Sequence, residues 1–320
     1  MQLKKILIIS LFFIWAGCGI GNEARVKKTL KKFEFRQHHL GMQVRIVLFS
    51  EDEAKAITDA RQAFAEIDRL DAIFSDYRVD SELNILVRQA VDSALVVSPE
   101  LFSVLTRAQE MAAWSDGAFD VTVGPLSQLW RKARRLQTLP TADELGQAKQ
   151  NTGWRLMRLF PASGKVLLLR HGLQLDLGGI AKGFIAEAAL NELRKAGCPH
   201  AMVEIGGEVA IGAPPPSTNG WLVHLPNDSQ KPLHLLRDVT VSTSGDTEQF
   251  MELNGVRYSH ILDPRTGLGL TSRVSVTVIA SDGALSDALS TTLSVLGEQA
   301  IPIARKRFKG ITVFFRKATG

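Results

Sequence analysis

Residues 176–183 read Asp-Leu-Gly-Gly-Ile-Ala-Lys-Gly and combine paired glycines with a lysine at the start of a predicted helix. Gly178 and Gly179 let the backbone approach a ligand closely, the first N–H groups of a helix attract anions, and Lys182 adds a positive charge. The segment therefore has the composition of a phosphate site. It has neither Walker A nor GxGxxG spacing, and a tight strand-to-helix turn with Asp176 near the N-cap explains it equally well.

A second group consists of Asp287, Ser290 and Thr291. The i, i+3, i+4 spacing places all three side chains on one face of a predicted helix. A carboxylate and two hydroxyls are the oxygen ligands that Mg²⁺ prefers, and this ion keeps further positions for substrate phosphates. Such clusters more commonly satisfy nearby backbone groups in the first turn of a helix. Spacing alone leaves a metal site and a local cap as alternatives.

His260 precedes a turn marked by Asp263-Pro264 and Thr266-Gly267, at the end of a strand-like run. Imidazole titrates near neutral pH, which suits a general base. A single histidine is more often structural, but the other six histidines of the chain lack this context. The pattern makes His260 a candidate base or ligand-binding group.

Three further segments, residues 74–82, 117–125 and 205–208, join polar or aromatic groups to turn residues. The first places Tyr77 between an aspartate and an arginine, which gives a ring face with a polar handle. Taken alone, each segment is more simply read as a structural turn.

Helices and strands are interspersed along the chain around these groups. Helical periodicity is found over residues 51–75, 100–115, 126–136, 180–196, 283–296 and 298–307, with another helix starting at Thr141. Strands are predicted over residues 33–49, 156–160, 165–169, 201–211, 221–225, 239–242, 274–280 and 311–315. Many neighbouring strands have short connections. We therefore expect an α+β fold with mixed, largely antiparallel sheets flanked by helices, rather than a doubly wound parallel sheet.

Composition narrows the class of protein. The 320 residues are 45% hydrophobic and 22% charged, which excludes a disordered chain. The net charge of +5 is too small to indicate a nucleic-acid partner. Two cysteines exclude a disulfide scaffold and a four-cysteine zinc site.

The N-terminus has the pattern of a secretory signal. Lys4 and Lys5 precede an apolar run over residues 6–15, and the small pair Ala16-Gly17 stands directly before Cys18. We expect a lipoprotein signal peptide over residues 1–17, lipidation of Cys18, a basic tether over 18–32 and one domain over 33–320. The protein would then be exported and membrane-anchored, facing the periplasm or the outer surface of the cell membrane. An ordinary signal peptide with an unmodified Cys18 is the alternative.

Seven segments taken in order carry a family resemblance: FSDYRVDSEL, GAFDVTVGPL, DLGGIAKG, GGEVAIG, TSGD, YSHILDPRTG and SDALSTTL. They resemble the motifs of the ApbE family of FAD:protein FMN transferases, over about residues 33–315. The resemblance implies an enzyme that uses Mg²⁺ to transfer the FMN moiety of FAD to a Thr or Ser hydroxyl of an acceptor protein, with release of AMP. A membrane redox subunit is the expected acceptor.

The resemblance also implies site residues. FAD would be contacted by Leu40, Tyr77, Ala118, Phe119, Asp120, Asp176, Lys182, His260 and Ile261. Mg²⁺ would be held by the Gly179 carbonyl and by Asp287, Ser290 and Thr291. His260 and Asp287 are the expected catalytic residues, the first as base and the second mainly as metal ligand. The family commonly has Met-Gly-Thr on the first strand, where this chain has Leu40-Gly41-Met42.

Two other functions fit the same site. If water replaces the acceptor hydroxyl, the enzyme is an FAD pyrophosphatase that yields FMN and AMP. If no reaction occurs, the protein is a flavin-binding lipoprotein.

Overall fold

A computed structural model describes residues 29–91, 93–225, 227–245 and 250–317. The predicted signal peptide and Cys18 lie outside these residues. Within the described part of the chain, no helix is long and apolar enough to cross a membrane.

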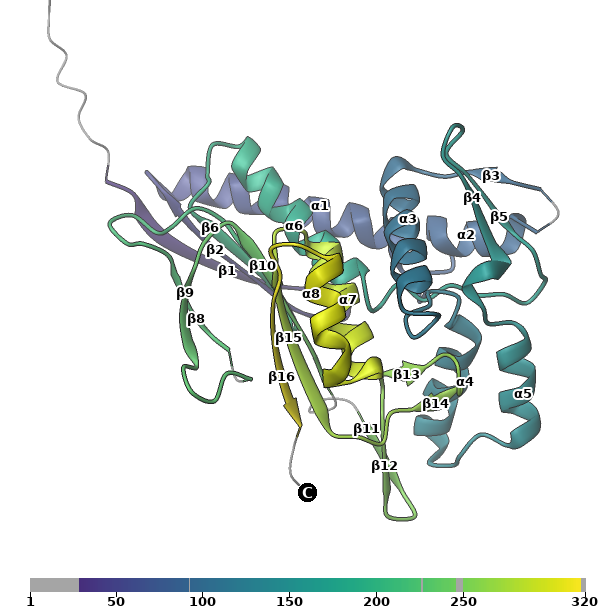
Figure 1. The fold of residues 1–320 in the computed structure, drawn as a ribbon. Helices are drawn as coiled ribbons and strands as arrows, with labels where there is room; N and C mark the ends of the chain where they lie inside the picture. The colour runs from purple at the N-terminus through teal and green to yellow at the C-terminus, as the bar shows by residue number, and fades with distance from the viewer. Residues whose placement is uncertain (1–28, 92, 226, 246–249, 318–320) are drawn as a thin grey trace, which may run out of the picture.

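A seven-stranded sheet forms the centre of the fold, in the order β1-β2-β6-β7-β10-β15-β16 (Figure 1). Its strands are β1 (Lys31–His39), β2 (Met42–Ser50), β6 (Ala201–Ile205), β7 (Glu208–Ile211), β10 (Val239–Gly245), β15 (Val274–Ala280) and β16 (Thr312–Lys317). Every neighbouring pair in this sheet is antiparallel. The predicted α+β class with largely antiparallel sheets is therefore confirmed.

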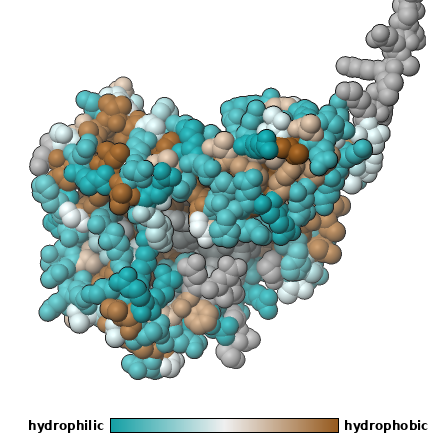
Figure 2. Space-filling model, turned by 180° about the vertical axis from the view of Figure 1, so that it is seen from behind, coloured by the Kyte–Doolittle hydropathy of each residue, from teal (hydrophilic) through white to brown (hydrophobic). Residues whose placement is uncertain are grey.

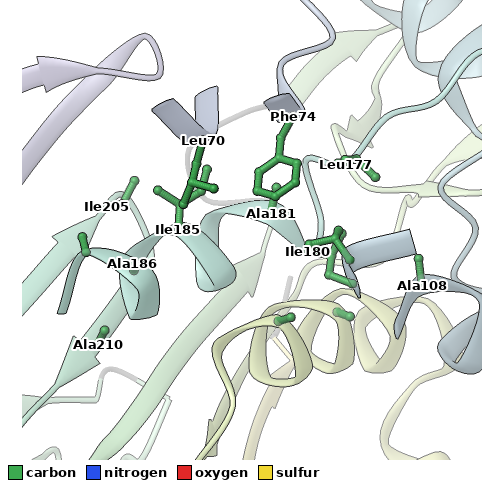
Figure 3. Close-up of a cluster of buried hydrophobic side chains, with 14 of the residues drawn as sticks. Leu70, Phe74, Ala108, Leu177, Ile180, Ala181, Ile185, Ala186, Ile205 and Ala210 are labelled. Atoms are coloured by element: carbon green, nitrogen blue, oxygen red, sulfur yellow. The ribbon is translucent and has the colours of Figure 1, made fainter. Parts of the chain in front are cut away.

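Three long helices pack with one face of the sheet: α1 (Glu53–Phe74), α6 (Ala181–Lys195) and α7 (Gly283–Leu296). α8 (Ile301–Arg307) follows after a short 3-10 turn, η2 (Glu298–Ala300). Apolar residues at helical spacing line the buried faces of these helices. Figure 3 shows Leu70 and Phe74 of α1 next to Ile185 and Ala181 of α6. This packing fixes the first turn of α6, where the site lies.

A second group of elements lies beside the sheet (Figure 1). It contains α2 (Glu82–Gln89), α3 (Pro99–Trp114), α4 (Gly124–Leu136), α5 (Ala142–Gln150), η1 (Trp154–Leu156) and the small sheet of β3 (Leu95–Val96), β5 (Lys165–Leu168) and β4 (Met157–Phe160). Buried residues of α2, α3 and the small sheet belong to the same hydrophobic cluster as those of α1 and α6. The two groups therefore form one domain.

Three hairpins complete the structure: β8 (Trp221–His224) with β9 (Leu233–Leu236), β11 (Phe250–Leu253) with β12 (Val256–Ser259), and β13 (Leu262–Asp263) with β14 (Leu268–Gly269). The β8–β9 hairpin packs through Trp221 against Phe49, with ring centroids 5.9 Å apart. Seen from behind, the surface is mostly hydrophilic, and apolar side chains form separate patches (Figure 2).

Several predicted elements need correction. The strand expected over residues 33–49 is the β1–β2 hairpin, because Leu40 and Gly41 turn the chain with φ of 55° and 70°. The strand expected over 201–211 is divided by Gly206, whose φ is 60°. In both places the apolar pattern of a strand resumes after the turn, so it did not show where one strand ends and the next begins.

Candidate active site

Helices α6 and α7 touch through their glycines. A Cβ atom on Gly183 would stand 2.0 Å from the carbonyl oxygen of Gly283, so only glycine allows this approach. The close crossing brings Asp287 to the first turn of α6, where its Oδ2 accepts a hydrogen bond from the Gly183 N–H at 3.0 Å. Asp287 is 1% exposed. Its partner lies on another helix, and α7 itself is capped by Asp282, so the local-cap alternative does not explain Asp287.

Lys182 lies at the centre of this crossing. Its Nζ donates to the Gly178 carbonyl at 2.6 Å and stands 3.4 Å from Glu208 Oε1 and 4.0 Å from Asp287 Oδ2. The predicted Lys182 and Asp287 are thus brought together. Glu208, at the start of β7, is an addition that sequence reasoning did not assign. Its only signal was the glycine pair before it, because the partners come from distant parts of the chain.

The environment of this cluster is strongly desolvating. Burial, followed by the charge of Asp287, raises the pKa of Glu208 to about 8. Burial also raises the pKa of Asp287, against the opposing charge of Lys182. Burial alone would lower the pKa of Lys182, but Asp287 and Glu208 outweigh it, so the lysine stays charged. Two nearly fully buried acids therefore face one lysine, whose side chain is 27% exposed.

Hydroxyl groups lie next to this cluster on α7 and β10. Ser244 Oγ is 2.7 Å from Ser290 Oγ and 3.1 Å from Thr291 Oγ1. Gly179 approaches so closely that a Cβ atom on it would stand 3.2 Å from Thr291 Oγ1. The four predicted metal-binding residues, Gly179, Asp287, Ser290 and Thr291, therefore share one region. Ser290 also donates to the Asp287 carbonyl at 2.9 Å, which is the local bond expected of a helical serine.

The start of α6 differs from the N-cap arrangement that the sequence suggested for Asp176. Asp176 is not the N-cap: its Oδ1 accepts from the Gly178 N–H at 2.8 Å, and the N-cap residue is Ile180. The Asp287 carboxylate accepts a hydrogen bond from the Gly183 N–H, where a bound anion could otherwise lie at the start of α6. The Ala181 N–H donates to the Leu177 carbonyl at 2.9 Å. The Ala181 and Gly183 N–H groups of this segment are therefore already bonded, and Lys182 supplies its positive charge.

Tyr77 and Asp176 both contact Arg131 of α4. Tyr77 is 76% exposed, and the guanidinium carbon of Arg131 lies 4.3 Å from the centre of its ring. Arg131 bonds Asp176 at 3.1 Å. Sequence reasoning predicted a basic helix here and gave none of its arginines a role.

Residues 118–120 are buried next to the loop that contains Gly179. Ala118, Phe119 and Asp120 are buried, and Phe119 Cε2 lies 3.4 Å from the position of a Cβ on Gly179. Asp120 Oδ1 accepts from the N–H and hydroxyl of Thr122 at 2.8 and 2.7 Å. Burial raises the pKa of Asp120 to about 6. Their side chains thus shape the loop against which Gly179 packs.

His260 is exposed and lies directly after β12, as the strand-end prediction required. Ile261 is buried, and its N–H donates to Ser259 Oγ at 3.0 Å. Trp130 of α4 holds the following turn through a 2.8 Å hydrogen bond from Nε1 to the Gly267 carbonyl. The histidine is therefore presented to solvent from a fixed turn.

Leu40 lies at the β1–β2 turn and packs against the main hydrophobic cluster. Met42 extends its sulfur to 3.1 Å from the position of a Cβ on Gly206, the residue two before Glu208. This end of the hairpin therefore approaches the loop that carries Glu208.

Comparison with known proteins gives a consistent result. The ApbE family model matches residues 40–315. An FAD:protein FMN transferase of Chlamydia muridarum is 34% identical over 265 residues, covering 80% of this chain and 83% of that protein. One of Treponema pallidum is 31% identical over 318 residues, covering 93% and 88%.

The fold matches solved structures as well. The apo form of flavinyl transferase ApbE from Pseudomonas stutzeri superimposes with a TM-score of 0.79 at 28% identity, covering 91% of this chain and 93% of that one. The flavin transferase ApbE from Vibrio cholerae gives 0.78 at 27% identity, covering 90% and 97%. Since the family model spans most of the chain and the relatives align over nearly their whole length, the chain belongs to the ApbE family.

Proposed function

We propose that the protein is a Mg²⁺-dependent transferase that moves the FMN moiety of FAD to a Thr or Ser hydroxyl of an acceptor protein and releases AMP. The observation that carries the proposal is the buried cluster of Lys182, Asp287 and Glu208 beside the hydroxyls of α7. The relatives named FAD:protein FMN transferase, which this chain matches over most of its length, support the same reaction.

The donor set fits a magnesium ion. Asp287 supplies a buried carboxylate, and the Ser290 and Thr291 hydroxyls and the Gly179 carbonyl are further hard oxygens. Glu208 Oε2 is a buried oxygen without a hydrogen-bond partner. With both acids ionised, Lys182 neutralises only one of them, so a bound cation would balance the remaining negative charge. When bound, Mg²⁺ would polarise the phosphate and stabilise the charge that develops on its oxygens.

The reaction exchanges one bond at the flavin-side phosphorus, and side chains of the site assist this exchange. An oxygen of the acceptor hydroxyl bonds to the flavin-side phosphorus, the bond from this phosphorus to the bridging oxygen breaks, and AMP leaves with that oxygen. Lys182 binds the phosphate oxygens as a fixed positive charge. His260 takes the hydroxyl proton, and its exposed position lets a protein acceptor reach it. Tyr77 and Asp176 bind FAD beyond the reacting phosphate.

We further propose that Cys18 carries a lipid and anchors the exported protein at the periplasmic or outer face of a cell membrane. The signal pattern of residues 4–18 supports this proposal. The predicted tether, which is shorter than expected because β1 already begins at Lys31, would keep the enzyme near a membrane redox subunit as acceptor. Cys18→Ser should release the protein from membranes, and mass spectrometry of an unmodified Cys18 in the mature protein would contradict the anchor.

One assay tests the reaction. Purified protein is incubated with FAD and Mg²⁺, with and without candidate acceptor proteins, and both AMP and protein-bound flavin are measured. AMP together with flavin fixed on the acceptor supports transfer. AMP without fixed flavin indicates the pyrophosphatase, and neither product indicates a flavin-binding protein. Activity that persists in excess EDTA would contradict the metal.

A further inference from the structure

Arg131 links two loops that are far apart in the sequence. Its Nη1 bonds Asp76 Oδ2 at 2.5 Å, and its Nη2 bonds Asp176 Oδ2 at 3.1 Å. Asp76 follows α1, whereas Asp176 lies just before α6. The same guanidinium stacks on the ring of Tyr77, with 4.3 Å from its carbon to the ring centre. One side chain of α4 therefore contacts three groups from these two loops.

The two carboxylates depend on this arginine. The Asp76 and Asp176 side chains are only 16% and 13% exposed, so water screens their mutual repulsion poorly. Burial and then the charge of Asp176 raise the pKa of Asp76, which shows that the two acids act on each other. A planar guanidinium can bond both at once and still stack on a ring, which an ammonium group cannot do.

The contacts continue from Arg131 to the reacting end of the site. Asp176 uses its other oxygen, Oδ1, to accept from the Gly178 N–H at 2.8 Å. The Gly178 carbonyl in turn accepts from Lys182 Nζ at 2.6 Å. Movement of Asp176 would therefore disturb the loop before α6, and movement of the arginine would also release the Tyr77 ring.

We propose that Arg131 is a positioning residue for FAD binding: it holds Tyr77 and Asp176 in the positions from which they contact FAD. This inference rests on the proposed function, in which both residues contact FAD. Lys182 also contacts Glu208 and Asp287, and these contacts do not involve Arg131. Loss of Arg131 should therefore act on the affinity for FAD more than on the transfer step.

The first experiment uses Arg131→Met in the full chain, with FAD affinity followed by flavin fluorescence in the presence of Mg²⁺. Loss of a charged hydrogen-bond partner should raise the Kd for FAD about 10- to 100-fold. AMP release at saturating FAD should stay within about threefold of the wild type. Lys132→Ala is the matched control, because Lys132 is the next residue of α4 and pairs only on the surface, with Glu144 at 2.9 Å. It should bind FAD as the wild type does.

A second pair of variants separates positioning from stability. The double variant Arg131→Met/Asp76→Asn lacks one of the two repelling charges. Its thermal stability should therefore be higher than that of Arg131→Met and closer to that of the wild type. Affinity for FAD should not recover, because the Tyr77 stacking partner and the Asp176 bond are still missing. If stability and affinity recover together, Arg131 has only a structural role. Arg131→Lys provides a folded alternative and should show weakened FAD binding despite its retained charge.

The outcomes distinguish this inference from the proposed function. If Tyr77→Leu and Asp176→Asn bind FAD normally, the proposed FAD site is wrong and the role of Arg131 is wrong with it. If those two variants bind weakly while Arg131→Met binds normally, only the inference about Arg131 is wrong. A large loss of turnover at saturating FAD, with unchanged affinity, would also overturn it.

Discussion

The crossing of α6 and α7 contains two similar contacts, in each of which a glycine N–H near the start of one helix donates to an acid of the other helix. Gly183 and Asp287 form one half: the glycine N–H of α6 donates to the acid of α7 at 3.0 Å. Gly283 and Glu187 form the other: the glycine N–H of α7 donates to the acid of α6 at 2.7 Å. Each acid stands four residues after the glycine of its own helix. The crossing is therefore nearly symmetric in its backbone and its bonds.

The charges around the two halves are also alike. Lys182 accompanies Asp287 and Glu208 on one side, and Arg107 accompanies Asp282 and Glu187 on the other. The surroundings differ. The acids differ most: the Asp287 side chain is 1% exposed and that of Asp282 is 36% exposed. The cations differ less, because Lys182 is 27% exposed and Arg107 is 37% exposed.

Glu187 and Asp282 line an open cavity of about 270 Å³. Water screens excess negative charge there, but it cannot do so around Asp287. The comparison teaches that burial of the acids, more than residue type, distinguishes the two halves of the crossing.

The strongest test of this comparison is a matched pair of substitutions. Asp287→Asn keeps an oxygen for the Gly183 N–H but removes the buried charge, so Mg²⁺-dependent AMP release should fall by about 10²–10³-fold. Glu187→Gln makes the same chemical change in the solvated half and should leave the rate within about threefold. Calorimetry should show Mg²⁺ binding lost only in the first variant. Equal losses in both would show that the two halves do not differ in function.

A second prediction concerns the backbone that both halves share. A Cβ on Gly183 would stand 2.0 Å from the Gly283 carbonyl oxygen, and a Cβ on Gly283 would stand 2.1 Å from that of Gly183. Gly183→Ala and Gly283→Ala should each lower the free energy of unfolding by about 1–3 kcal/mol or more, because the helices must separate. Urea unfolding measures the change.

Gly146→Ala in α5 is the control for this pair, since no atom lies within 4 Å of its Cβ position. It should stabilise the protein by up to about 1 kcal/mol through helix propensity. If alanine at position 183 were tolerated as well as at 146, close contact would not be what fixes Asp287 on α6.

Sequence signals were sufficient where both ends of an element are marked locally. The helix over residues 283–296 was predicted with the bounds of α7, because Asp282 caps its start and Gly297 ends it. The β1–β2 turn was missed because Leu40-Gly41 lacks the Asn-Gly or Asp-Gly signal of a tight hairpin. Glu208 and Arg131 were missed for another reason: their partners come from other elements, and only the tertiary fold brings them together.

The last prediction concerns the titration of Glu208. Its pKa is about 8 in the folded protein, against an ordinary value of 4.5. Between these values the folded protein holds a proton that the unfolded chain has released. The free energy of unfolding should therefore fall as pH rises through this window, by at most about 1.4 kcal/mol per pH unit. Above the window the acid is ionised in both states and the contribution no longer changes.

Glu208→Gln cannot titrate, so its stability should lack this decline, and its advantage over the wild type should grow from about pH 4.5 to about pH 8. Urea unfolding in EDTA at several pH values measures the difference without a bound cation. Glu208→Asp retains a titrating carboxyl and should keep a decline, which separates titration from altered packing. A constant difference between Glu208→Gln and the wild type would mean that Glu208 ionises in the folded protein as it does in the unfolded chain. Burial beside Asp287 would then not raise the pKa of Glu208.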